Sequence, residues 1–279
     1  MPDNSGPLPP TFQFSQASLQ DYVDCPRRFQ LRYVLMQPWP ALVVDGPQEA
    51  ERHMQRGRDF HRLVQQYELG LEPDSLEATI HGPLLLGWWR TFLAHPPADL
   101  PETLRRAELG LAAPVGAFRL VAKIDLLAVD PGQRLVIVDW KTVSKVPPRA
   151  ALAQRLQTRV YRYLVVEAGS AFNGGQNPLP EQVEMVYWFA QAGGDTIRFV
   201  YDTTQHAAGG DYLASLAQQI ASHSEAIWPL TADGRRCRFC NFRSLCDRGV
   251  TAGFLEDLDD DLEPEEVEID LEQIAEIEF

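Results

Sequence analysis

RLVIVDWKT, residues 134–142, is a strongly apolar run that ends in two charged side chains. Continuous apolar residues from Leu135 to Val138 predict a strand buried on both faces. Asp139 and Lys141 follow two residues apart, so their side chains point to one face of the sheet. A buried strand would hold this pair rigidly, although a salt-bridged strand end has the same pattern.

The preceding strand, FRLVAKIDLLAV (residues 118–129), carries a second acidic residue, Asp125. Asp130-Pro131-Gly132 predicts a turn between the two strands. If they pair through it, Asp125 and Asp139 lie side by side and can bind a hard divalent cation such as Mg²⁺. Lys141 could then orient water or stabilise charge on a phosphate. This arrangement suits metal-assisted hydrolysis.

The rest of the chain alternates between helix and strand patterns. A helix over 16–23 is expected behind an N-cap at Ser15, and a second over 26–36 begins at Pro26. Further helices are predicted at 47–69, 82–95, 155–168 and 204–227, and further strands at 107–113, 184–190 and 196–202. This order predicts an α/β core with helical additions.

Three segments are expected along the chain. Residues 1–13 are predicted to be disordered, residues 14–250 to form one domain, and residues 251–279 to form an acidic disordered tail. Within the domain we expect a helical part (14–100), an α/β core carrying the acidic residues (101–203), and a helix with a cysteine-rich module (204–250).

The net charge of −14 comes almost entirely from the tail, because 13 of the 39 acidic residues and none of the 25 basic residues lie in 256–279. The folded part is thus nearly neutral and can carry basic surface. The tail could be inert, a DNA mimic, or a hook for a partner protein. No signal peptide and no membrane span are recognisable, so a cytoplasmic location without membrane association is expected.

Four cysteines are clustered in the pattern of a metal site rather than of disulfides. Cys237, Cys240 and Cys246 are close together, and Cys25 lies far upstream. Four thiolates suit zinc or an iron–sulfur cluster, and ligand count alone does not choose.

Arginines and aromatic residues surround these cysteines. A surface of this composition suits single-stranded nucleic acid, with arginines on phosphates and rings beneath bases. Alternatively, the rings pack around the cysteines and the arginines are solvated. The residues are Arg27, Arg28, Arg32, Arg235, Arg236, Arg238, Arg243 and Arg248, with Phe29, Tyr33, Phe239 and Phe242. A separate stripe, Arg155, Arg159 and Arg162, is expected to form a solvated helix face.

Four short motifs occur in a characteristic order: Gly57-x-x-x-His61, Ala122-x-x-Asp125, Asp139-x-Lys141 and Gln157-x-x-x-Tyr161. Over residues 12–250 the chain resembles the PD-(D/E)XK nucleases, in particular the branch with the nuclease domains of RecB and AddB. Ala122 stands where that branch often has glycine. We expect this difference to affect the local backbone slightly and to leave the carboxylates in place.

The resemblance implies a restriction-endonuclease-like core with a mixed central sheet flanked by helices. It also implies that His61, Asp125, Asp139 and the carbonyl of Trp140 ligate Mg²⁺ or Mn²⁺. Lys141 would be the catalytic lysine, and Gln157 and Tyr161 would contact substrate or brace the site. Glu108 could support the ligands or face solvent.

The spacing of the cysteines and the surrounding CPRRFQLRY and CRFCNFRSLC resemble the iron–sulfur staple of AddB-type nucleases, also found in CRISPR-associated spacer-acquisition nucleases and a mitochondrial exonuclease. This implies a 4Fe–4S cluster held by Cys25, Cys237, Cys240 and Cys246.

The expected activity is a metal-dependent deoxyribonuclease, a single-strand exonuclease of repair or recombination. The alternatives are a CRISPR-associated spacer-processing nuclease and a non-catalytic iron–sulfur DNA-binding module. The expected partner is DNA that is single-stranded or has a free end. The chain lacks a Walker A motif, so a helicase motor would be another chain, and a single-strand binding protein is a further candidate partner.

Overall fold

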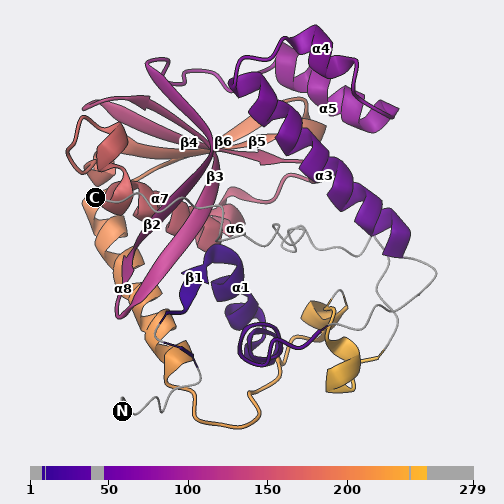
Figure 1. Cartoon of the computed structure of the whole chain (residues 1–279), viewed down its shortest axis with the longest axis vertical. Coiled ribbons are helices and arrows are strands. Elements are labelled where there is room, and N and C mark those ends of the chain that lie inside the picture. Colours follow the sequence, from indigo (N-terminus) through magenta and orange to yellow (C-terminus); the bar gives the residue numbers. More distant parts are fainter. Residues whose placement is uncertain (1–7, 10, 39–46, 239, 250–279) are drawn as a thin grey trace.

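The computed structural model describes residues 8–9, 11–38, 47–238 and 240–249. Its centre is a mixed six-stranded sheet with the order β1-β3-β4-β5-β6, in which β2 pairs with β3 (Figure 1). The β1–β3 and β4–β5 pairs are parallel, and the others are antiparallel. The strands are β1 (Gln13–Ser15), β2 (Leu104–Val115), β3 (Phe118–Asp130), β4 (Arg134–Lys141), β5 (Val183–Phe189) and β6 (Asp195–Val200).

The predicted β3–turn–β4 hairpin is confirmed. Asp130 pairs with Arg134 across the turn, and the ladder runs to Leu126 opposite Val138. β4 lies between β3 and β5, and its residues from Leu135 to Val138 are fully buried. This central place explains the unbroken apolar run, because both faces of the strand are covered.

Helices cover both faces of the sheet (Figure 1). One layer contains α1 (Gln16–Asp24), α2 (Pro26–Phe29), α6 (Arg149–Gln154), α7 (Leu156–Ala168) and α8 (Thr203–Ala221). The other contains α3 (Pro47–Glu68), α4 (Pro73–Glu77) and α5 (Pro83–Ala94). The predicted α/β core with a central mixed sheet is therefore correct.

Short helices complete the described chain. A π-helix, Gln30–Val34, continues α2, and the 3₁₀ turns are Ser170–Phe172, Pro180–Gln182, Ala190–Ala192, Gly234–Cys237 and Arg243–Cys246. The π-turn keeps the expected helix of 26–36 nearly intact, ending it at Val34. Ser15 caps α1 as predicted, by accepting a hydrogen bond from the N–H of Ser18.

Several boundaries differ from the sequence prediction. The helix expected over 155–168 is preceded by α6, and the two are separated by the extended backbone of Arg155. α8 ends at Ala221, six residues early, and Trp228 beyond it stacks on Phe29 in the core. That aromatic packing requires the chain to turn inward where helix was expected.

Order extends further toward the N-terminus than we expected for residues 1–13. Gln13 belongs to β1 and pairs in parallel with Arg119, and Leu8 is buried. Residues 1–7 and 10, like the tail segment predicted at 251–279, lie outside the described residues. In the described ranges, no helix is long and apolar enough to span a membrane.

Candidate active site

The two acidic strand residues lie side by side at the end of the β3–β4 ladder. Asp125 and Asp139 follow directly on the Leu126–Val138 pair, and both are buried. The Oδ2 of Asp125 accepts a hydrogen bond from the backbone N–H of Trp140 at 2.9 Å. This bond ties the β3 carboxylate to the β4 backbone between Asp139 and Lys141. The predicted juxtaposition of the two carboxylates is therefore present.

Asp139, Lys141 and Gln157 form a closed buried triangle. The Nζ of Lys141 lies 2.8 Å from Asp139 Oδ2 and donates to Gln157 Oε1 at 3.0 Å. Gln157 Nε2 donates to Asp139 Oδ1 at 2.7 Å and to the hydroxyl of Tyr161 at 3.2 Å. α7 thus delivers Gln157 and Tyr161, one helical turn apart, to the charged pair at the end of β4. All four predicted residues lie together.

His61 reaches the same site from the other helical layer. Its Nδ1 lies 3.4 Å from Asp125 Oδ1. One ligand atom each from His61, Asp125 and Glu108 lies within 4.8 Å of the others, a spacing that suits a cation. Asp139 is not in this group. The third ligand atom comes from Glu108, whereas the resemblance implied Asp139.

The position of Glu108 depends on an unusual backbone conformation. The β2–β3 register would place it opposite Asp125, but no backbone pair forms between Ala107–Leu126 and Leu109–Ile124. Glu108 has a φ of +52°, a region that non-glycine residues seldom occupy. Such strain persists where the surrounding structure imposes it, often at functional sites. No sequence pattern signals this conformation, which is why Glu108 could not be assigned a role from sequence.

The charges in this group shift its pKa values. Burial would lower the pKa of His61, but Asp125, Asp139 and Glu108 together outweigh it and raise that pKa to about 9. Burial would raise the pKa of Asp125, but His61, the N–H of Trp140 and Lys141 hold it below its ordinary value. The acidic group thus attracts positive charge, and a metal ion would replace the proton on His61.

Gly57 allows α3 to approach β4 closely. A Cβ at this position would lie 3.2 Å from the Oγ1 of Thr142, the residue after Lys141. His61 stands one helical turn further along α3 and faces Asp125. The Gly-x-x-x-His spacing therefore has a physical basis: glycine sets the helix against the end of β4, and histidine uses the resulting position.

The sequence model of the PD-(D/E)XK nuclease superfamily matches residues 13–247. The chain belongs to this superfamily. No protein with a curated description matches this nuclease. Its sheet and helices are similar to the solved structure of SSO0001, at 13% identity and a TM-score of 0.40, over 86% of this chain and 88% of that one. They are also similar to a protein described as "Putative exonuclease" from Eubacterium rectale, at 9% identity and a TM-score of 0.47, over 74% and 79%.

Nucleases of this superfamily act on nucleic acid and use divalent metals, and the His61–Glu108–Asp125 group offers ligands of the required kind. The imidazole and two carboxylates supply nitrogen and oxygen donors, and hard cations such as Mg²⁺ favour the carboxylates. The donor set of this nuclease therefore fits a divalent metal.

The four cysteines of the nuclease are brought to one pocket. Cys25, Cys237, Cys240 and Cys246 all line it. Burial raises the pKa values of Cys237 and Cys246, and that of Cys240 to about 11, with neighbouring cysteines adding to each shift. Thiols in such surroundings become thiolates when a metal binds them.

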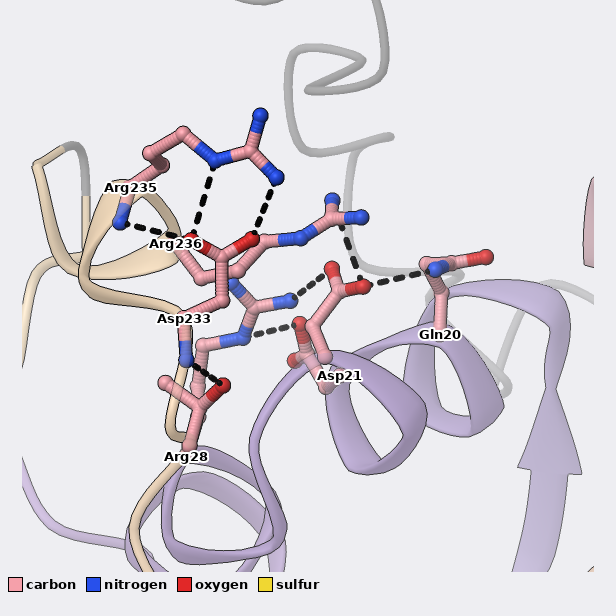
Figure 2. Close-up of polar contacts among 8 residues, drawn as sticks. Gln20, Asp21, Arg28, Asp233, Arg235 and Arg236 are labelled. Atoms are coloured by element: carbon pink, nitrogen blue, oxygen red, sulfur yellow. Dashed lines mark hydrogen bonds and ion pairs between the residues drawn. The ribbon is translucent and has the colours of Figure 1, made fainter. Parts of the chain in front are cut away.

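Ion pairs join the two cysteine segments without any metal. Asp24, next to Cys25, binds Arg28 at 2.8 Å and Arg236, next to Cys237, at 3.3 Å. Arg28 also binds Asp21 at 2.7 Å, and Arg32 lies 3.3 Å from the same carboxylate. Figure 2 shows Asp21 and Arg28 from α1 and α2 beside Arg236 from the C-terminal segment. We call Asp21, Asp24, Arg28 and Arg236 the acidic latch.

Several of the arginines around the cysteines have a structural role. Arg28, Arg32 and Arg236 neutralise buried carboxylates, and Arg243 is itself buried, so these four brace the module. Of the aromatic residues, Phe29 and Phe242 are core. Phe239 lies outside the described residues. The side chains of Arg235, Arg238 and Arg248 are exposed, and Arg235 is paired with Asp233 at 2.8 Å.

The expected solvated stripe on α7 is wrong for Arg162. This residue is buried, donates to the carbonyl oxygens of Thr158 and Val200, and lies over the ring of Tyr201. α8 packs on this side of α7, which a helical wheel of α7 alone could not indicate.

Proposed function

We propose that the chain is a deoxyribonuclease that hydrolyses phosphodiester bonds with Mg²⁺ or Mn²⁺ held by His61, Asp125 and Glu108. The observation that carries this proposal is the meeting of that donor group with the Lys141–Asp139–Gln157 triangle at the end of the β3–β4 ladder. A metal site beside a buried lysine combines the two elements that phosphodiester hydrolysis requires.

Asp139 is the further ligand that we propose. Both of its oxygens already have partners, Lys141 and Gln157. An ionised carboxylate has about four lone-pair sites, so these contacts leave it able to bind a cation. The carbonyl of Trp140 remains a predicted ligand because it lies between the two residues that flank the site.

A bound divalent ion polarises a phosphoryl oxygen and lowers the pKa of water. Lys141 carries its positive charge at a fixed place, because Asp139 and Gln157 hold its ammonium group on two sides. Charge that is positioned in advance stabilises a transition state best, since no reorganisation is needed. We therefore assign Lys141 to the developing negative charge on the phosphate, and Gln157 and Tyr161 to positioning Lys141.

We propose single-stranded DNA with a free end as the substrate, and repair or recombination as the setting, within the RecB and AddB branch. The exposed side chains of Arg238 and Arg248 contribute positive charge to the surface of the cysteine module, and proteins that bind single strands use a positively charged groove along the phosphates. A helicase or a single-strand binding protein would be the partner chain, in the cytoplasm.

We further propose that the cysteine pocket holds a 4Fe–4S cluster and not zinc. Zinc binds thiolates at about 2.3 Å in a tetrahedron, which requires sulfur atoms roughly 3.8 Å apart. A 4Fe–4S cluster is also held by four thiolates. The proposal of the cluster rests on the likeness of the cysteine spacing and its flanking segments to the iron–sulfur staple of AddB-type nucleases, and iron analysis tests it against zinc. Cys25, Cys237, Cys240 and Cys246 would hold the cluster, which would fasten α1 and α2 to the C-terminal segment.

The proposal is tested with protein purified without oxygen. It is incubated with Mg²⁺, Mn²⁺ or EDTA and with single-stranded DNA, duplex DNA or RNA labelled at either end. We expect stepwise shortening of single-stranded DNA with metal and none in EDTA. Lys141→Ala is the control for a contaminating nuclease. Absence of cleavage with either metal, or equal cleavage by Lys141→Ala, would refute the proposed activity.

A further inference from the structure

Lys123 pairs with Glu108 at the rim of the metal group. Its Nζ lies 2.5 Å from Glu108 Oε2. In the β2–β3 register Lys123 is opposite Gly110, so Glu108 is its diagonal neighbour on the adjacent strand. The side chain of Lys123 is 50% exposed, whereas that of Glu108 is 16% exposed. The pair therefore joins an exposed ammonium group to a carboxylate that is also one of the three candidate metal ligands.

Glu108 cannot serve both partners equally. A divalent ion bound by His61, Glu108 and Asp125 would lie close to the ammonium group of Lys123. Like charges a few ångströms apart repel, and a doubly charged ion competes for the carboxylate more strongly than one ammonium does. Lys123 has a flexible four-carbon stem and open solvent beside it, so it can leave Glu108 at low cost.

The released ammonium group would stand at the edge of the metal site. Lys123 is two residues from Asp125 on β3, so the two side chains share a face of the strand. A strand of DNA with one phosphate at the metal would bring neighbouring phosphates across this rim. Lysine is a strong point-charge ligand for phosphate.

We propose that Lys123 is a DNA-phosphate-binding residue that Glu108 masks until the divalent metal binds. This inference rests on the proposed nuclease function and adds to it a coupling between metal and substrate. In the metal-free protein, Glu108 neutralises Lys123, and the DNA contact is absent. When the metal binds, it engages the carboxylate of Glu108 and Lys123 is released. Lys123 then contacts DNA, so DNA binding is strengthened only at a site that holds the metal.

The test measures DNA binding by fluorescence anisotropy with a labelled single-stranded oligonucleotide. All proteins carry Lys141→Ala, so that the strand stays intact in Mg²⁺. Each phosphate contact contributes about 0.7 to the slope of log K against log salt for single strands. Lys123→Gln should reduce the slope by about that amount in Mg²⁺, and by much less in EDTA. Lys123→Arg should retain most of the slope.

The matched control is Arg119→Gln. Arg119 is exposed on the same strand, four residues from Lys123, and pairs with Gln13 and Pro114 in the ladder. Its removal should change the slope equally little in both conditions. If the effect came only from removing a positive charge on β3, Arg119→Gln and Lys123→Gln would reduce the slope in Mg²⁺ equally.

Glu108→Gln supplies the opposite perturbation. In EDTA it should unmask Lys123 and tighten DNA binding, and this gain should vanish in the Glu108→Gln/Lys123→Gln double variant. The proposal is overturned if Lys123→Gln leaves the Mg²⁺ slope unchanged, if it changes both slopes equally, or if Glu108→Gln does not tighten metal-free binding. Failure of the nuclease function itself is separate, because it is read from cleavage by the wild-type protein.

Discussion

The side chain of Asp125 on β3 accepts a hydrogen bond from the backbone N–H of Trp140 on β4, at 2.9 Å. Backbone pairing between the two strands stops at Leu126–Val138, so the carboxylate continues the ladder by one step. This contact leaves Oδ1 of Asp125 facing His61. One acidic residue thus holds two strands together and presents one oxygen to the candidate metal.

Lys141→Ala and Asp139→Ala should each abolish detectable cleavage, with a loss of about 10²–10⁴-fold, the range for removing one positioned charge or proton-transfer group. Both side chains are buried and bonded to each other and to Gln157. The measurement is the rate on end-labelled DNA, beside DNA affinity and visible absorption. We expect affinity and absorption to persist in Lys141→Ala. Wild-type rates in either variant would remove these residues from the mechanism.

Substitutions at Gly57 should change protein stability and metal binding differently, because this residue lies where α3 approaches β4. Alanine favours a helix by about 1 kcal/mol over glycine, but a Cβ at Gly57 would press on Thr142 at 3.2 Å, whereas one at Gly87 on α5 meets nothing within 4 Å. Gly87→Ala should therefore stabilise the protein, and Gly57→Ala should gain less. Gly57→Leu should push α3 away from β4 and weaken Mg²⁺ binding through His61, as measured by calorimetry. Equal gains in stability for both alanine variants would contradict the close approach.

Protein purified without oxygen should be brown, with broad absorption near ~400 nm and about four irons per chain. Cys25→Ser should lose this colour and lower the free energy of unfolding by about 2–5 kcal/mol, the range for removing a native cross-link. Lys141→Ala should keep the colour and lose less stability. A colourless protein with one equivalent of zinc would show that the pocket is a zinc site.

Asp24→Asn should weaken the latch that joins Cys25 to the C-terminal segment. The carboxylate is buried and contacts Arg28, Arg236 and Gln20. Its neutralisation should lower the free energy of unfolding by about 1–3 kcal/mol, the cost of leaving buried charged partners unsatisfied. Iron retention after exposure to a chelator should fall in parallel.

The control for this variant is Asp233→Asn. Asp233 pairs with Arg235, whose side chain is 69% exposed, so solvent screens the pair. It should retain iron like the wild-type protein. If both variants lose iron at the same rate, the latch has no special part in holding the cysteines.

Deleting residues 256–279 should tighten single-stranded DNA binding at low salt. The segment carries thirteen acidic residues and no basic ones. A tethered polyanion reaches an effective concentration of about millimolar, so it would compete with DNA for exposed arginines. The gain should shrink as the Debye length falls to about 10 Å at 0.1 M salt. Identical affinities of the full and truncated chains throughout a salt titration would leave the tail without this role.

Much of the framework follows from local signals. Period-two and continuous apolar patterns located β2 to β6, Ser15 and Pro26 marked two helix starts, and Asp130-Pro131-Gly132 located the hairpin turn. Because a turn sets the register of its hairpin, the pairing of Asp125 with Asp139 followed as well. β1 was missed, since three residues carry too little pattern. α4 and α6, five and six residues long, were missed for the same reason.

The sequence by itself determined the elements, the hairpin and the order of the motifs, because these depend on neighbours a few residues apart. Tertiary structure alone decided that Glu108 joins His61 and Asp125, since Glu108 stands at a gap in the β2–β3 ladder with a φ of +52°, which glutamate seldom adopts. It also decided that Arg162 is buried beneath α8 and that Arg28 and Arg236 neutralise Asp24. Charge and burial at these positions are set by residues far away in the chain, and no local pattern encodes such contacts.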